Sequence, residues 1–361
     1  MASMVPLIVK ETLFGDYGYA PKDCPDLTGK VAVITGGTNG IALSLARTMY
    51  THGASLYVLS SSEKTGKDGV AYIKSGNLSD APNDYAEGFG KGEDTSGGGE
   101  KTGKVEFVQV NLEDLKQTGE VAKSLAGKLE RLDLLACIAG KGVNAFELTK
   151  DGLDSHLTLN NLSHHLLVSH LLPVLEKTSK LPGADVRIVS MSSELHRATF
   201  GGPGSFGGKF ANDKEFSEDI GPSNLYARTK ACVLLFTKGL LQRHIQPPSK
   251  VLVFATHPGA VATGQQDQFK PAYGETVGAV MGAVTRPFMR RPDQGSLSAL
   301  WALVAPDARS PDWENGSYFT DPKQLGGPSN ESQDQELVDN FWTGSERVIQ
   351  KVTPLGSWKS Q

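Results

Sequence analysis

Tyr226 and Lys230 lie four residues apart in Tyr-Ala-Arg-Thr-Lys, a spacing that brings both side chains to one face of a helix. An ammonium beside a phenol favours the phenolate, so we expect the pKa of Tyr226 to fall from its ordinary value near ~10. A phenol tuned in this way can exchange a proton with a carbonyl or hydroxyl oxygen near neutral pH. Because the chain has 9 tyrosines, such a pair also arises by chance, and its weight depends on the surrounding motifs.

Glycines follow the first predicted strand at a spacing that suits phosphate binding. The strand covers 31–34, and the turn after it is Thr-Gly-Gly-Thr-Asn-Gly at 35–40. Gly36 permits a tight exit from the strand, and Gly40 lets a pyrophosphate approach the next helix, whose N-terminal amides and dipole favour anions. Ala42 stands where a third glycine is expected, which loosens the match. The other candidate cofactor-binding residues of this turn are Thr38, Asn39 and Ile41. The alternative interpretation is a glycine-rich turn that only connects the strand to the helix.

The end of the second predicted strand indicates which dinucleotide binds. An acidic residue here would accept the ribose 2′-hydroxyl of NAD and repel the 2′-phosphate of NADP. None occurs before Glu63, whereas Ser60 and Ser61 offer hydroxyls and Lys64 and Lys67 offer charge. We therefore predict NADP, with NAD not excluded. A solvated serine loop is the alternative.

Ser193 follows a buried strand predicted over 186–191. In doubly wound sheets, ligands gather at the carboxyl ends of the strands. A hydroxyl at this point can hydrogen-bond a substrate carbonyl and hold it for proton transfer. A serine that only caps the strand is the alternative, and its position relative to Tyr226 separates the two.

Asn160 lies inside a long helix predicted over 153–175. A buried asparagine in a helix needs partners for its amide, so it could hold a helix kink and a water that links Lys230 to solvent. An asparagine on the solvated face is the alternative. His164 and His165 follow, but adjacent helical positions point roughly 100° apart and converge poorly on one metal ion. We predict structural or surface histidines and no metal site.

The elements that must position these residues alternate between strand and helix. The predicted strands are 31–34, 56–59, 105–110, 132–138, 186–191, 251–255 and an edge strand at 317–319; further helices are predicted at 41–52, 112–129, 226–244, 276–285, 295–303 and 336–352. This order predicts a single doubly wound α/β Rossmann-type domain over 29–361, with a parallel sheet of about seven strands. An irregular arm at 1–28 precedes it, and a Gly-rich, flexible insertion interrupts it at about 76–103.

Composition narrows the function classes. The chain has 361 residues, 39% hydrophobic, with a formal net charge of -4, which gives no electrostatic case for nucleic acid or an acidic membrane surface. The cysteines, Cys24, Cys137 and Cys232, have neither disulfide nor zinc-ligand spacing. No apolar run approaches the ~20 residues that a membrane span needs. We expect a cytoplasmic protein that acts on a small molecule.

With these motifs in order, the chain resembles the short-chain dehydrogenase/reductases of the classical type. The motifs that carry the resemblance are Thr35-Gly36-x-x-x-Gly40, Ala139-Gly140, Asn160, Ser193, Tyr226-x-x-x-Lys230 and His257-Pro-Gly-Ala-Val-Ala-Thr263. The likeness runs from about Leu27 to at least Thr263. Within the family, the chain looks like retinol-dehydrogenase-like reductases and fungal reductases of secondary metabolism, to judge by Ser-Glu-Leu-His196 and Gly316-Ser-Tyr-Phe319.

The resemblance implies a role for each motif residue. Tyr226 would be the acid/base, Lys230 would lower its pKa and hold the nicotinamide ribose, Ser193 would position the carbonyl and Asn160 would support a proton relay. The cofactor would also contact Asn111, Leu112, Ala139, Gly140, Pro258, Gly259, Val261 and Thr263. Family habit also implies a homodimer. The family's Asn-Asn-Ala-Gly is replaced by Cys137-Ile-Ala-Gly140, which removes two amides that normally brace the central strand.

The hypothesis is therefore hydride transfer between NADP(H) and a carbonyl/alcohol pair on a fairly apolar substrate, as in ketoreductases of secondary-metabolite biosynthesis. Aromatic residues that could line an apolar pocket, or only anchor loops, are Phe200, Phe206, Phe210, Phe269 and Tyr273. Two alternatives stay open. One is a non-catalytic dinucleotide sensor or scaffold, and the other is a lyase or epimerase of related fold with a tightly held cofactor.

Overall fold

Short runs of aliphatic and β-branched residues form the strands of a central sheet. The computed structural model describes residues 17–90, 92–198, 208–262, 274, 289–356 and 358. In spatial order the strands are β3 (Lys104–Gln109), β2 (Ser55–Ser60), β1 (Val31–Thr35), β4 (Leu134–Cys137), β5 (Arg187–Met191), β6 (Leu252–Thr256), β7 (Tyr318–Asp321) and β8 (Gln324–Leu325). Neighbouring strands are parallel up to β7, and only β8 is antiparallel. The predicted doubly wound sheet is confirmed, with β8 as an added edge.

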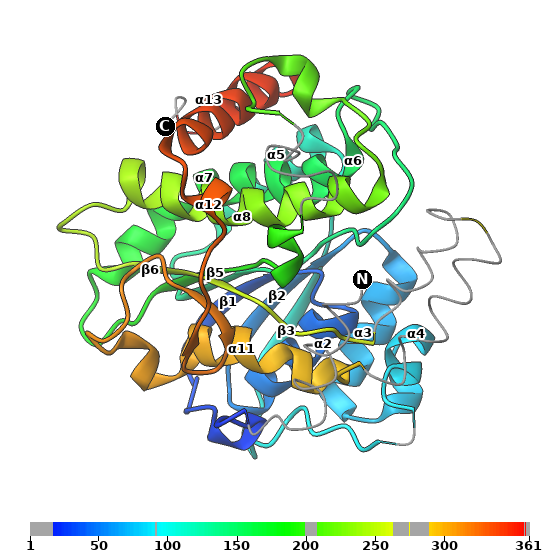
Figure 1. Ribbon diagram of the computed structural model, residues 1–361. Coiled ribbons are helices and arrows are strands. Elements are labelled where there is room, and N and C mark those ends of the chain that lie inside the picture. Colours follow the sequence, from blue (N-terminus) through cyan, green and yellow to red (C-terminus); the bar gives the residue numbers. More distant parts are fainter. Residues whose placement is uncertain are drawn as a thin grey trace.

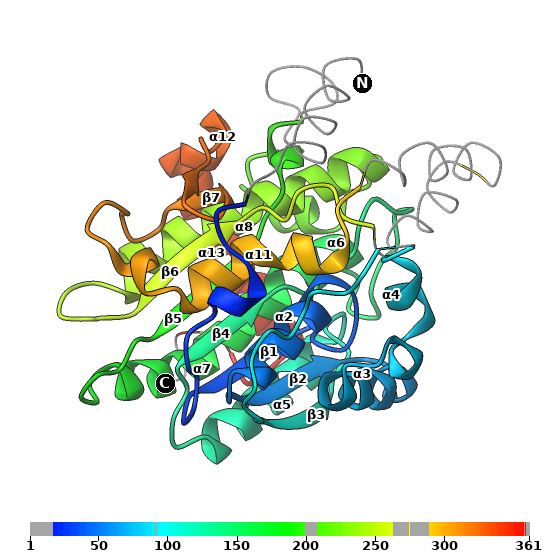
Figure 2. The same ribbon diagram turned by 90° about the horizontal axis from the view of Figure 1, so that it is seen from below.

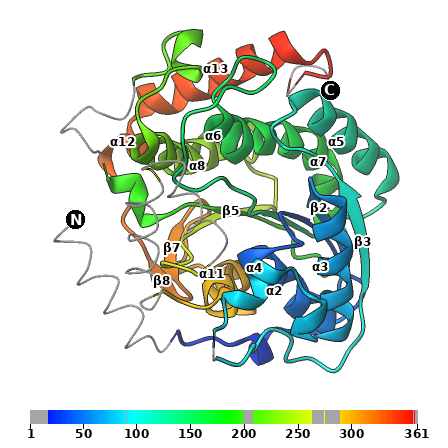
Figure 3. The same cartoon turned by 90° about the vertical axis from the view of Figure 1, so that its right-hand side faces the viewer.

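Helices cover both faces of the sheet (Figure 1). One layer holds α5 (Leu115–Lys128), α6 (Ser155–Leu157), α7 (Ser163–Ser179), α8 (Pro222–His244), α12 (Asn330–Gln333) and α13 (Gln335–Val352). The other holds α2 (Gly40–Thr51), α3 (Glu63–Ser75), α4 (Asn83–Glu87) and α11 (Pro292–Val304). Figure 2 looks onto this second layer, and Figure 3 shows the sheet between the two layers. Because the sheet is covered on both faces, β1, β4 and β5 are almost entirely buried, as parallel strands usually are.

The order of the strands determines where a ligand would bind. The chain runs outward from β1 to β2 and β3, then crosses back to β4 on the other side of β1. The carboxyl ends of β1 and β4 thus meet at the point where the strand order reverses, and such a switch point opens a crevice at the sheet edge.

The long helix predicted at 153–175 is interrupted. One turn of α-helix, α6, is followed by a π-helix at Thr158–Leu162 and then by α7, which continues six residues beyond Pro173. The predicted helices at 295–303 and 336–352 correspond to α11 and α13. The helix predicted at 276–285 lies outside the described residues.

The insertion between α3 and β3 is docked on the domain, although its composition predicts a solvated segment. Tyr85 and Phe89 are buried, and the Tyr85 hydroxyl is 2.8 Å from the Ser44 hydroxyl of α2. Farther along, the Thr95 hydroxyl donates to Asp293 of α11 at 2.5 Å. The two buried aromatic side chains and the hydrogen bond to Asp293 hold the insertion on the domain despite its many glycines. Helix α4 lies beside α3 in two views (Figures 1 and 2).

Within the part of the chain that the structure describes, no helix is both long enough and apolar enough to cross a bilayer.

Candidate active site

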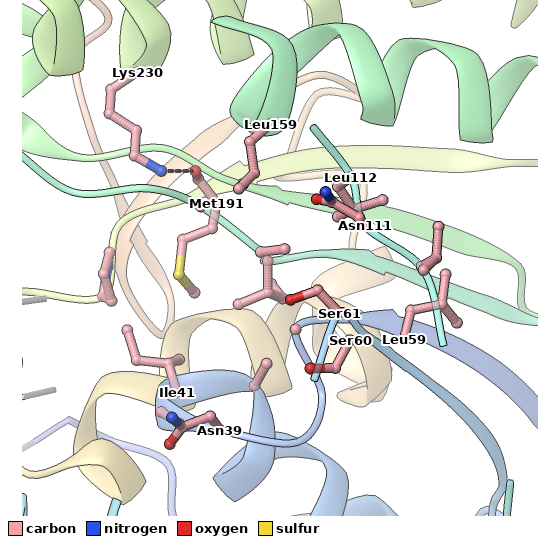
Figure 4. Close-up of a pocket in the computed structure, with 18 of the residues that line it drawn as sticks. Asn39, Ile41, Leu59, Ser60, Ser61, Asn111, Leu112, Leu159, Met191 and Lys230 are labelled. Carbon is pink, nitrogen blue, oxygen red and sulfur yellow. Dashed lines mark hydrogen bonds between the residues drawn. The ribbon is translucent and has the colours of Figure 1, made fainter. Parts of the chain in front are cut away.

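A cavity of about 390 Å³ opens at the carboxyl ends of the strands. It gathers residues from the glycine turn, the end of β2, the segments after β3 and β4, and helix α8 (Figure 4). The predicted site residues that line it are Gly36, Asn39, Gly40, Ile41, Ser60, Ser61, Asn111, Leu112, Ala139, Gly140, Tyr226, Lys230 and Pro258. Residues from six separate segments thus meet in one cavity, as the family motifs imply.

Five predicted site residues that the structure describes do not line this cavity: Thr38, Asn160, Ser193, Gly259 and Val261. Thr38 is fully buried and its backbone lies against Gly69 of α3, where an added Cβ would meet the Thr38 carbonyl oxygen at 2.7 Å. Gly259 has φ +80° and packs against Arg290, and Val261 pairs with Arg290 in an isolated bridge. Asn160 lies behind the cavity, and Thr263 is outside the described residues.

Helix α8 presents Tyr226 to the cavity and buries Lys230. The Lys230 ammonium lies 5.5 Å from the centre of the Tyr226 ring and donates a hydrogen bond of 2.9 Å to the Met191 carbonyl at the end of β5. The Ser193 hydroxyl hydrogen-bonds the Tyr226 phenol and also accepts from the Leu195 amide at 3.2 Å. Ser193 therefore caps the 3-10 helix Glu194–Arg197 that follows its strand, and it also meets Tyr226.

The predicted fall in the pKa of Tyr226 is wrong for this structure. Burial of the phenol raises its pKa to about 12, and the hydrogen bond from Ser193 only partly opposes that rise. Burial also lowers the pKa of Lys230 to about 8, because an ammonium removed from water is destabilised. The spacing predicts proximity correctly, but it carries no information on desolvation, which here outweighs the attraction between the two groups.

Asn160 lies in the π-helix Thr158–Leu162, so the interruption of the helix falls at the asparagine that could hold a kink. Its side chain is buried and accepts from the Lys141 amide at 2.7 Å. It donates to the Thr229 hydroxyl at 2.8 Å, one residue before Lys230. The alternative of a solvated asparagine is wrong. A cavity of about 10 Å³, roughly the volume one water needs, lies beside Asn160 and is also lined by Asn161 and His164.

His164 and Thr35 brace the ends of β1 and β4, a role that sequence reasoning missed. The Thr35 hydroxyl accepts from the amides of Ile138 and Ala139 at 2.9 and 3.0 Å. His164 donates from Nδ1 to the Asn160 carbonyl at 3.0 Å, so its Nε2, 2.9 Å from the Thr35 oxygen, is the acceptor. Burial lowers the pKa of His164 to about 4, which keeps it neutral. This network holds the strand end where the family's two amides are missing, and the histidine is structural, as predicted.

The glycine turn has the backbone that a phosphate cradle needs. Gly36 has φ +69°, and a Cβ there would meet the Ala139 Cα at 3.2 Å. The Asn39 side chain caps α2 by accepting from the Gly40 amide at 2.7 Å. Ala42 is buried within α2, so the missing third glycine does not disturb the start of the helix. The turn, the cavity and the N-terminus of α2 together fit a dinucleotide pyrophosphate.

Two predicted features fall elsewhere. Lys64 and Lys67 do not line the cavity; they pair with Asp68 and Glu63 on the exposed face of α3, each at 2.7 Å. Phe210 is buried against Phe216 and Phe341, so it anchors its loop. The other aromatic candidates, Phe200, Phe206, Phe269 and Tyr273, lie outside the described residues.

Asp84 of α4 lines the cavity and was missed. Its carboxylate accepts from the Asn39 amide nitrogen at 2.6 Å. An acid that selects the cofactor is expected at the end of β2, and the composition of the insertion predicts a solvated segment. The sequence therefore does not single out Asp84. The signal that this segment docks was its two aromatic residues, Tyr85 within α4 and Phe89 just after it.

Comparison with known proteins places the chain in a family. No protein-family model matches the sequence. The chain is 31% identical over 346 residues to a protein of Neurospora crassa named as oxidoreductase bli-4, mitochondrial, covering 94% of this chain and 76% of that protein. It is 27% identical to the short chain dehydrogenase/reductase dpchH of Colletotrichum higginsianum, covering 93% and 79%.

A solved structure shares the fold. It is titled as an NAD(P) dependent gluconate 5-dehydrogenase from Beutenbergia cavernae with bound NADP, and it matches with a TM-score of 0.55 at 19% identity, covering 82% of this chain and 96% of that one. The chain belongs to the short-chain dehydrogenase/reductase family and is an oxidoreductase of that family.

Proposed function

We propose that this oxidoreductase transfers hydride between a nicotinamide dinucleotide and the carbonyl/alcohol group of a fairly apolar small molecule. The observation that carries the proposal is the hydrogen bond between Ser193 and Tyr226, next to Lys230, at one end of a cavity that reaches the glycine turn. A proton donor, a carbonyl-holding hydroxyl and a phosphate cradle are the parts that this reaction needs.

When bound, the nicotinamide supplies or accepts the hydride. The chain's own residues would handle the proton. Ser193 would hold the substrate oxygen beside Tyr226. The phenol is protonated because burial raises its pKa to about 12. It would donate its proton to the substrate oxygen as that oxygen gains negative charge. The Lys230 ammonium would stabilise the phenolate that remains. The hydrogen bonds of Asn160 would hold the neighbourhood of Lys230 in place.

The apolar character of the substrate is supported by the lining near this end. Leu159 and Met191 lie near Lys230 in the cavity (Figure 4). Ile138 also lines it. The narrower proposal of a secondary-metabolite intermediate rests on the family resemblance. The cytoplasmic location and the homodimer also stay predictions, and the Neurospora relative is itself named as mitochondrial.

The test is consumption of NADPH and NADH by the purified protein over a panel of aldehydes and apolar ketones. Tyr226→Phe should lower kcat by about 10²- to 10⁴-fold, the usual contribution of general acid catalysis, while nucleotide binding survives. Tyr57→Phe is the matched control, because Tyr57 lies on β2 beside Lys128 and away from the cavity.

Turnover that persists unchanged in Tyr226→Phe would refute the assignment of the proton donor. Nucleotide binding with no turnover of any substrate would favour the sensor or scaffold. A tightly held nucleotide that copurifies and does not exchange would favour a lyase or epimerase.

A further inference from the structure

The insertion places a carboxylate on the dinucleotide cavity. Asp84 lines the cavity together with Gly36, Asn39, Ser60 and Ser61. Its Oδ2 atom is 2.6 Å from Nδ2 of Asn39, the residue whose other amide atom caps α2. The acid therefore lies at the end of the cavity formed by the glycine turn and by the end of β2.

The position of Asp84 is fixed by the packing of its neighbours. The next residue, Tyr85, is buried, and its hydroxyl lies 2.8 Å from that of Ser44 and 3.0 Å from that of Tyr72. Gly88 is pressed against the domain so closely that a Cβ would meet the Ala262 carbonyl oxygen at 2.7 Å. The packing of Tyr85 and Gly88, which both follow Asp84, thus holds α4 against the domain.

The other charges around the cavity do not neutralise this carboxylate. Among the described residues that line the cavity, the only other charged side chain is Lys230, which lies across the cavity from Asn39 (Figure 4). Lys64 and Lys67, the cations expected near β2, are paired with acids of α3 and turned to solvent.

We infer that Asp84 makes this protein bind NAD(H) in preference to NADP(H). The inference rests on the proposed function, because it concerns the cofactor of the same site. A carboxylate can accept a hydrogen bond from a ribose hydroxyl of NAD, whereas a 2′-phosphate, with a charge near ~−2 at neutral pH, would be repelled. The acid usually sought at the end of β2 is supplied here by the insertion, so the NADP predicted from Ser60 to Lys67 is the disfavoured cofactor.

The test is binding of NADH and of NADPH to the full chain, measured by calorimetry without substrate. The wild-type protein should bind NADH at least about tenfold more tightly than NADPH, as expected for one like-charge contact at a partly buried site. Asp84→Asn should remove most of this ratio by improving the affinity for NADPH. Glu93→Gln is the matched control: it removes the same charge from the same insertion, but Glu93 is exposed and does not line the cavity.

Each result decides the question. Wild-type protein that binds NADPH as tightly as NADH or more tightly overturns the inference and leaves the proposed function intact, and this measurement does not require the variant to fold. An unchanged ratio in folded Asp84→Asn also overturns it, as does an equal change in Glu93→Gln. Binding of neither nucleotide by folded protein overturns the proposed function, and the inference with it.

Discussion

Tyr226 and Lys230 illustrate how burial, as well as proximity, sets the chemistry of a side chain. The phenol and the ammonium are close, but desolvation shifts the pKa of each toward its uncharged form. The spacing in the sequence is sufficient to find the pair. Their protonation could not be predicted, because it depends on how much of the surrounding chain excludes water from them.

The lowered pKa of Lys230 predicts a pH dependence of carbonyl reduction. Its ammonium form is present below about pH 8, while Tyr226 keeps its proton to about pH 12. We expect kcat/KM for reduction to be flat below about pH 8 and to fall above it, as the positive charge that stabilises the phenolate is lost. A pH–rate profile checks this. Lys230→Arg, whose charge persists, should abolish the decline even if its activity is low; a decline that remains would assign the titration to another group.

At the scale of elements, the ends of β1 and β4 depend on one hydroxyl. The sequence shows that two asparagine side chains, which brace the central strand in the family, are absent here. The compensating hydroxyl is that of Thr35 on β1, and His164 of α7 hydrogen-bonds it; no local pattern indicates that these two residues meet. Contacts between distant elements of this kind are outside the reach of periodicity and spacing.

Thr35→Val tests this brace. The substitution keeps the shape of the side chain but leaves the Ile138 and Ala139 amides and the His164 Nε2 atom without their partner. We expect a loss of about 1–3 kcal/mol in the free energy of unfolding, measured by urea denaturation, as for a buried polar group left unpaired. Thr35→Ser retains the hydroxyl and should lose clearly less. Equal losses in both variants would show that the methyl group, and not the hydroxyl, matters.

At the scale of the whole molecule, the order of the elements is the part that sequence predicts well. The alternation of apolar strands with helices gives the doubly wound sheet, and family motifs locate its carboxyl edge. Strand β8, the π-helix at 158–162 and the docking of the insertion were not predicted. The first is only two residues long, and the other two depend on tertiary contacts that override local composition.

Buried neutral histidines should make the whole domain sensitive to mild acid. Burial lowers the pKa of His164 to about 4 and of His165 and His257 to about 3, from 6.5. Below pH 6.5 the unfolded chain therefore binds protons that the folded chain does not, so stability falls as the pH falls. Between pH 6.5 and pH 5, each histidine lowers the free energy of unfolding by an amount on the order of 2 kcal/mol.

Urea midpoints measured across this range check the slope. His165→Phe should make the dependence on pH shallower, because it removes one titrating group from the core. A stability that does not change between pH 7 and pH 5, or a slope that is the same in His165→Phe, would contradict this account.

The buried ammonium of Lys230 also has a consequence for the evolution and engineering of the protein. Its environment opposes the charge that the proposed proton transfer uses, and an uncharged residue of similar length at this position would remove that desolvation cost. Selection for heat resistance alone would favour such a replacement, which by the proposed mechanism would also remove turnover. Selection for more thermostable variants of this enzyme therefore needs an activity screen in every round.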